Sequence, residues 1–198
     1  MTEARPEPRR MTISDPQVMR ALAHPARIAI MEYLSSRDDG GTATECAEIA
    51  GLSPSATSYH LRALAKFGLI EQAPSRGDAR ERVWRTFSSN WMADAGRDAG
   101  PDGRAAEQAL VEAHAARDME RARDWSRRAG EEPAEWYDVA LFSDILLLLT
   151  AEEMAGVNEA VSAVLEPYRQ RNRRTDPPAG ARAVSVQYHV VPLPYRTM

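Results

Sequence analysis

Apolar residues recur at helical spacing through residues 15–67, and proline and glycine interrupt the pattern at regular intervals. Asp15 and His24 each precede a proline, and a capping residue followed by proline is typical of a helix start. Two short helices are predicted after these caps. Their apolar faces are formed by Val18, Met19, Leu22, Ile28, Ile30, Met31 and Leu34.

A third and a fourth helix are predicted after the glycine-bearing turn at residues 38–41. Thr42, with Glu45 three residues later, matches a capping box, and Gly51 ends this brief third helix. The fourth helix covers residues 53–67, because a serine-proline cap starts it and a glycine follows it. Its buried stripe consists of Thr57, Leu61, Leu64 and Ala65.

A β-hairpin is predicted next, because apolar and polar residues alternate on both sides of a glycine-bearing loop. Its strands are residues 69–73 and 82–87. Residues 104–128 then read as one long helix with a thin, alanine-rich apolar stripe. Such a stripe suits close packing against another helix.

The last part of the chain is less regular. Residues 141–149 form an apolar run that fits either a buried strand or the end of a helix, since periodicity does not separate the two. Thr150 and Glu153 form a capping box for an amphipathic helix. Residues 183–191 have strand-type composition, which is compatible with pairing to residues 141–149 in a small sheet.

The formal net charge of −4 argues at first against a nucleic-acid partner, but its distribution changes the picture. Residues 1–89 carry 12 basic and 11 acidic side chains, whereas residues 90–198 carry 13 and 18. No acidic residue falls between positions 53 and 70. One segment of the chain is therefore locally positive.

Composition excludes several classes of protein. Cys46 is the only cysteine, so an intrachain disulfide and a paired-thiolate metal site are both excluded. The apolar run at residues 141–149 is much shorter than the roughly 20 residues that a membrane span needs, and no export signal precedes it. We therefore expect a cytoplasmic protein with no membrane partner.

The fourth predicted helix carries the candidate chemistry. If its apolar stripe is buried, the opposite face presents small hydroxyls and positive charges, which suit contacts to phosphates and base edges of double-stranded DNA. The predicted contacts from this helix are Ser53, Ser55, Ser58, Tyr59, Arg62 and Lys66. The hairpin adds Arg76, Arg80, Arg82 and Arg85.

Two stretches, LAHPARIAIM at residues 22–31 and LSPSATSYHLRALAKFGLI at residues 52–70, resemble the ArsR-type family of bacterial winged-helix repressors. The resemblance implies a homodimer that binds a pseudo-palindromic operator through helix 53–67 and a wing at residues 74–82. Many metal-sensing members carry a cysteine pair in the helix before the recognition helix, whereas this chain has Cys46 alone there. We accordingly expect no metal and no cofactor.

The predicted fold is mainly α with small β elements. Residues 1–12 are expected to be a disordered leader, residues 13–90 a winged helix-turn-helix domain, and residues 91–103 a linker. Residues 104–198 are expected to hold a long dimerisation helix and a smaller α/β region.

Two alternatives to a plain regulator stay open. Residues 104–198 would bind a small-molecule effector in the first, and the winged helix would serve protein association in the second, although its positive face counts against that. No nucleophile-base pair, phosphate loop or metal cluster supports an enzyme. A packed or capping role is preferred for His60 over a DNA contact. A solvated pair is preferred for His114 and Asp118 over a metal site shared with a partner subunit. A structural aromatic cluster is preferred over an effector pocket for Trp125, Trp136, Tyr137 and Phe142.

Overall fold

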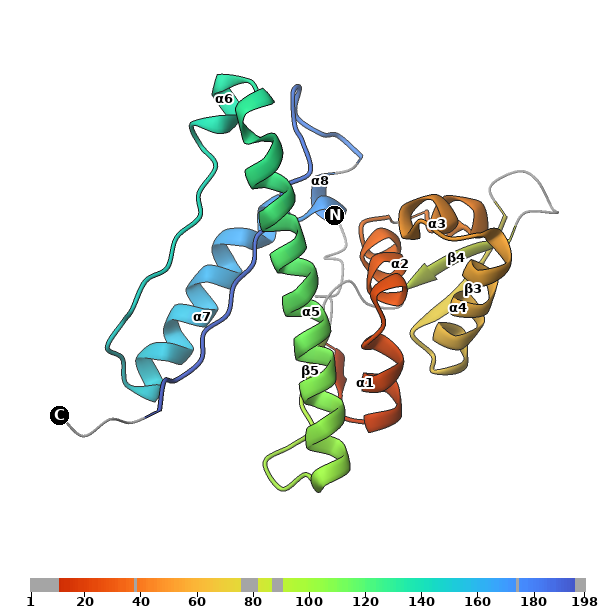
Figure 1. The fold of residues 1–198 in the computed structure, drawn as a ribbon, viewed down its shortest axis with the longest axis horizontal. Coiled ribbons are helices and arrows are strands. Elements are labelled where there is room, and N and C mark those ends of the chain that lie inside the picture. Colours follow the sequence, from red (N-terminus) through yellow and green to blue (C-terminus); the bar gives the residue numbers. More distant parts are fainter. Residues whose placement is uncertain (1–10, 38, 76–81, 87–90, 174, 195–198) are drawn as a thin grey trace, which may run out of the picture. The chain divides into compact units, whose positions relative to one another are not determined.

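The computed structural model describes residues 11–37, 39–75, 82–86, 91–173 and 175–194 (Figure 1). The chain divides into two compact units, the first ending at Arg121 and the second beginning at Ala122. This boundary falls inside the long helix α5 (Pro101–Arg128) and not in the expected linker at residues 91–103. The long helix itself, predicted over residues 104–128, is confirmed.

The helices of the first unit begin where the caps predict. They are α1 (Pro16–Leu22), α2 (Pro25–Ser35), α3 (Ala43–Ala50) and α4 (Pro54–Lys66). Asp15 accepts a hydrogen bond from the Gln17 N–H at 2.7 Å, and His24 Nδ1 accepts one from the Ala26 N–H at 3.2 Å. Thr42 and Glu45 make both hydrogen bonds of the predicted capping box.

A three-stranded sheet completes this helical core. Strands β3 (Ile70–Ala73) and β4 (Val83–Thr86) pair antiparallel and confirm the predicted hairpin, although Phe87 lies outside the described residues. The short strand β2 (Gly41–Thr42) adds to the other edge of β4, where a turn was expected. A Cβ at Gly40 would lie 2.3 Å from the Trp84 carbonyl oxygen, so only glycine permits this close pairing.

A second, parallel pair joins β1 (Met11–Ile13) to β5 (Trp91–Ala93). The expected leader (residues 1–12) and linker (residues 91–103) therefore each overlap a strand. This pairing joins segments far apart in the sequence, and Ile13 is only 5% exposed. Local patterns do not encode such a contact.

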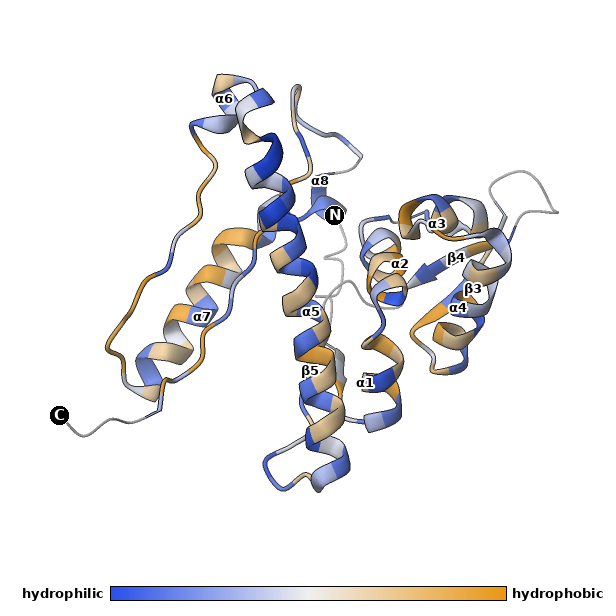
Figure 2. Cartoon of the chain, in the orientation of Figure 1, coloured by the Kyte–Doolittle hydropathy of each residue, from blue (hydrophilic) through white to orange (hydrophobic). Residues whose placement is uncertain are grey.

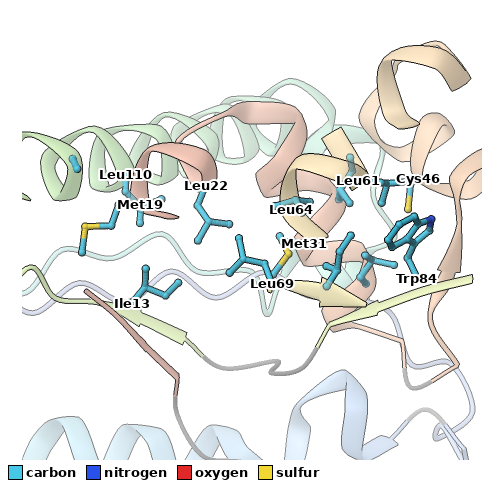
Figure 3. Close-up of a cluster of buried hydrophobic side chains, with 14 residues drawn as sticks. Ile13, Met19, Leu22, Met31, Cys46, Leu61, Leu64, Leu69, Trp84 and Leu110 are labelled. Atoms are coloured by element: carbon cyan, nitrogen blue, oxygen red, sulfur yellow. The ribbon is translucent and has the colours of Figure 1, made fainter. Parts of the chain in front are cut away.

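The core of the first unit gathers side chains from every helix of that unit and from the sheet (Figure 3). Leu61 and Leu64 of α4 are 1% and 0% exposed, and Leu110 of α5 packs into the same cluster. Ion pairs add to this attachment of α5: Arg20 binds Asp102, and Glu32 accepts hydrogen bonds at 2.7 Å from Arg117 and Arg121. The first part of α5 is thus a structural component of the first unit.

The second unit contains α6 (Ala134–Tyr137), α7 (Ala151–Leu165) and α8 (Gln170–Arg173), with 3-10 turns at Ala129–Glu131 and Glu166–Tyr168. The predicted capping box of Thr150 and Glu153 is confirmed. Residues 140–150 and 181–194 adopt neither helix nor strand, so the suggested sheet between residues 141–149 and 183–191 is wrong for the isolated chain. Among the described helices, none combines the length and apolarity needed to cross a bilayer.

The aromatic residues of the second unit also differ from expectation. Arg128 lies over the Trp125 ring at 5.1 Å, and Arg182 lies over the Trp136 ring at 4.8 Å. Tyr137 and Phe142 are 54% and 86% exposed. The expected aromatic cluster is therefore wrong: arginines cover two of the rings, and water reaches the other two.

Candidate nucleic-acid interface

A tight turn sets the position of α4 relative to α3. Gly51 has φ +64°, a left-handed conformation that favours glycine, and it ends α3. The Leu52 N–H reaches back to the Ala47 carbonyl oxygen at 3.0 Å. Ser53 then caps α4 by accepting a hydrogen bond from the Ala56 N–H at 3.3 Å, and Pro54 occupies the first helical position. Helix, turn and helix follow one another within a few residues.

The inner face of α4 is the predicted stripe. Thr57 and Leu64 are fully buried, Leu61 nearly so, and Ala65 is half-buried. The Thr57 hydroxyl donates to the Ser53 carbonyl oxygen at 3.0 Å, so this buried polar group is satisfied. The stripe fixes which side of the helix faces outward.

The outer face carries most of the predicted contact residues. Ser53, Ser55, Tyr59, Arg62 and Lys66 are exposed, and Tyr59 retains 59% of its surface. Ser58 differs from these residues because it is half-buried, and its hydroxyl donates a hydrogen bond to the Pro54 carbonyl oxygen at 2.8 Å. That hydroxyl therefore offers a ligand an acceptor more readily than a donor. Contact of these residues with DNA stays a prediction.

The electrostatics of this face favour an anion. The N-terminus of a helix carries partial positive charge, and α4 has no acidic residue in its first turn. Arg62 and Lys66 add full positive charges further along, and no acidic residue occurs between positions 53 and 70. The Lys66 ammonium also lies 5.9 Å from the Phe67 ring centroid.

The hairpin contributes less charge than its arginine content predicts. Arg85 lies directly opposite Glu71 in the strand register, and its guanidinium binds the Glu71 carboxylate at 2.5 and 2.7 Å. Glu71 largely neutralises it, which weakens Arg85 as a phosphate contact. Arg82 is exposed, while Arg76 and Arg80 lie outside the described residues. The sequence signal that could have revealed this ion pair is the opposite charge of two residues at facing positions of the predicted hairpin.

Comparison with known families gives one match. Residues 22–73 match a helix-turn-helix domain. This stretch runs from the end of α1 through α2, α3 and α4 to the end of β3. The turn at Gly51 and the outward face of α4 both lie within it. The comparison with curated proteins found no match.

Some solved structures resemble the chain distantly. A ZitR double mutant from Lactococcus lactis is 18% identical over 73% of this chain and 75% of its own, with a TM-score of 0.31. The adhesin competence repressor AdcR from Streptococcus pyogenes is 16% identical over 74% and 80%, with a TM-score of 0.32. A MarR family protein from Mycobacterium tuberculosis, in complex with salicylic acid, is 19% identical over 76% and 87%, with a TM-score of 0.30. At such TM-scores these likenesses support no conclusion about function.

His60 belongs to the interior of the helix-turn-helix domain. It is 8% exposed, its ring lies 4.7 Å from that of His24, and Arg27 Nε donates to its Nδ1 at 3.4 Å. Burial lowers the pKa of His60, and the nearby His24 and Arg27 lower it further. A neutral, packed histidine agrees with the interpretation preferred from the sequence.

Cys46 is also part of this domain's core. It is fully buried, and burial raises the pKa of its thiol to about 12. Such a thiol stays protonated at neutral pH, when only the thiolate is a good nucleophile or metal ligand. Within the described ranges, no group of three or more His, Cys, Asp or Glu side chains is placed to hold a metal ion.

Proposed function

We propose that the chain is a sequence-specific DNA-binding transcriptional regulator of the ArsR type, in which α4 enters the major groove. The observation that carries this proposal is the outward face of α4 within a segment that matches a helix-turn-helix domain. That face is exposed and free of acidic residues. The helix N-terminus gives it partial positive charge, and Arg62 and Lys66 give it full positive charges toward the C-terminus. An α-helix of this kind fits the major groove of B-DNA.

The exposed residues of α4 divide by chemistry. Arg62 and Lys66 supply charge for phosphates or guanine edges, while Ser55 and the Ser53 cap lie at the helix N-terminus, where phosphate groups bind favourably. Tyr59 offers a hydroxyl and a ring on the same face. In the hairpin, Arg82 is the stronger phosphate contact, because Arg85 is paired with Glu71.

The homodimer is part of the proposal, because a pseudo-palindromic operator requires two copies related by a two-fold axis. On α5, Leu110 packs into the core of the first unit of the same chain, whereas Val111 and Met119 are 57% and 49% exposed. Ala115, midway between them, is exposed as well. This outward stripe at four-residue spacing supports α5 as a dimer contact. Occupation of the operator by the dimer would repress transcription.

Binding to DNA is tested by fluorescence anisotropy on duplex DNA from upstream of the protein's own gene, at several salt concentrations. The proposal predicts that affinity falls steeply with salt. The double variant Arg62→Ala, Lys66→Ala should bind more weakly, with a salt slope reduced by about 0.9 for each lost phosphate contact. Arg104→Ala, which removes an exposed arginine from α5, is the matched control and should leave the slope unchanged.

Absent binding, or binding that is insensitive to salt, contradicts the proposal. An equal loss of DNA affinity in Arg104→Ala would also contradict it, because the effect would then depend on net charge and not on the residues of α4. A second comparison addresses the hairpin: Arg82→Ala should weaken binding more than Arg85→Ala.

The proposed dimer contact through α5 is tested by surface substitutions and not by truncation. Removing α5 would expose the core around Leu110 and so destabilise the first unit. Val111→Glu with Met119→Glu keeps that core intact and should raise the dimer dissociation constant by about tenfold or more, which equals about 1.4 kcal/mol. Sedimentation equilibrium measures this constant, and an unchanged value excludes α5 from the dimer contact.

A further inference from the structure

Two segments of the second unit contain many hydrophobic residues (Figure 2), and most of their large apolar side chains are exposed. They lie at residues 141–149 and 184–193, on either side of α7 in the sequence. Leu148 is 100% exposed, and Leu141 and Phe142 are above 80%. The remaining large apolar side chains exposed there are Ile145, Leu146, Leu147, Leu149, Val184, Val186, Tyr188, Val191 and Leu193.

The apolar surface is large for a single chain. These twelve side chains are on average about 70% exposed, and a buried aliphatic side chain removes on the order of 100 Å² from water. Summed over both segments they offer roughly 800 Å² of apolar surface, whereas the largest contiguous patch on a typical monomer is about 300–600 Å². A specific interface buries about 800 Å² on each partner, so the surface is as large as one side of a stable dimer.

The sequence of both segments suits strands that lack partners. Residues 145–149 are apolar at consecutive positions, which is typical of a strand covered on both faces. Residues 184–188 alternate, with Val184, Val186 and Tyr188 on one side and Ser185 and Gln187 on the other. In the isolated chain neither segment forms a strand, and no backbone hydrogen bond joins the two described segments.

Among the described residues of the second unit, only α7 is long enough to cover the two segments. The apolar positions Met154, Val157, Val161 and Leu165 of α7 are half-buried, and one helix covers a single face of a sheet. A segment that is apolar on both sides still needs a second cover. The described part of this unit has no other helix longer than four residues apart from the end of α5.

Both segments are anchored at one end. The first runs directly into Thr150, whose capping box starts α7. The second begins beside Arg182, which binds the Glu132 carboxylate at 2.7 and 3.2 Å and stacks on Trp136. The hydrogen bonds from Arg182 lower the pKa of Glu132, so this anchor stays charged at neutral pH. The chain thus fixes one end of each segment and leaves most of their large apolar side chains exposed.

From these observations we propose that the two segments bury their apolar side chains against the same segments of a second copy of the chain and pair with them as strands. Strand edges are self-complementary, and most soluble oligomers are two-fold homodimers. A membrane surface fits less well, because residues 90–198 carry 18 acidic against 13 basic side chains. The contact is separate from α5 and does not depend on DNA binding.

A pair of neighbouring substitutions tests the proposal in the full chain. Val186→Glu places a charge among the apolar side chains, whereas Gln187→Glu places the same charge on the opposite side of the strand. Sedimentation equilibrium should give a dimer dissociation constant raised at least tenfold for Val186→Glu and nearly unchanged for Gln187→Glu. Circular dichroism should show native helix content in both. Equal constants for the two variants, or a wild-type chain that is monomeric, overturn the proposal.

Disulfide cross-linking tests directly whether a second copy of the chain covers the two segments. Because Cys46 is fully buried, the wild-type chain should form no cross-link under mild oxidation. A chain with Leu148→Cys mixed with a chain with Val186→Cys should form disulfide-linked dimers faster than a chain with Gly130→Cys, an open position in the same unit that measures random collision. The double variant Leu148→Cys, Val186→Cys reports pairing within one chain. Cross-links only within the chain, or at the collision rate, contradict the proposal.

Discussion

Substitutions at Leu64 and Arg62 distinguish the structural role of α4 from its proposed role in DNA binding. The Leu64 side chain is fully buried in the core of the first unit (Figure 3). Arg62, two residues earlier on the same helix, is exposed. Leu64→Ala leaves a cavity in this core, and such substitutions lower the free energy of unfolding by about 2–5 kcal/mol. Domains are typically stable by about 5–15 kcal/mol, so most of the variant should remain folded.

Urea unfolding followed by circular dichroism measures this loss. With a slope of about 1–3 kcal/mol per molar urea, the midpoint should fall by on the order of 1–2 M, while the slope stays constant. The folded variant should bind DNA with nearly unchanged affinity. Arg62→Ala is the counterpart: its free energy of unfolding should change by less than about 0.5 kcal/mol, and its DNA affinity should fall. A loss below about 1 kcal/mol for Leu64→Ala would refute the buried position of α4.

Three further predictions follow. Gly51→Ala forces a left-handed backbone on alanine and should cost about 1–2 kcal/mol, seen as a lower melting temperature; an unchanged temperature contradicts the turn geometry. His114 and Asp118 are half-buried and not the expected solvated pair. Burial lowers the pKa values of His60 and His114, so the unfolded chain binds protons first as the pH falls. The free energy of unfolding should therefore decrease below about pH 6.5, and His60→Gln should weaken this dependence; a pH-independent value argues against both shifts. Cys46 should not react with a thiol reagent until the protein is unfolded, and rapid native labelling would disprove its burial.

The helices of the first unit were predictable because their signals are local. A cap and its hydrogen-bond acceptor lie within three residues, as at Thr42 and Glu45, so the sequence alone determines them. The outward face of α4 followed from the same reasoning, since burial of Leu61 and Leu64 leaves Arg62 and Lys66 outside. DNA contact by these residues stays a prediction.

The features that escaped prediction depend on distant parts of the chain. Strands β1 and β5 are three residues each, and their pairing follows from the packed core. The neutralisation of Arg85 by Glu71 depends on the strand register. The apolar run at residues 141–149 fits a buried strand or the end of a helix, but the described chain forms neither there, because the run has no strand partner and stays exposed.

The proposed function depends on the exposed face of α4, which should read the sequence of double-stranded DNA. Selection of bound duplexes from a random pool, carried out in parallel for the wild-type chain and for Arg62→Ala, tests this role. The wild-type chain should enrich one motif with two related half-sites about 10 base pairs apart, and the variant should lose preference at one position in each half-site. No enriched motif, or the same motif with both proteins, would contradict the assignment of α4 as the reading helix.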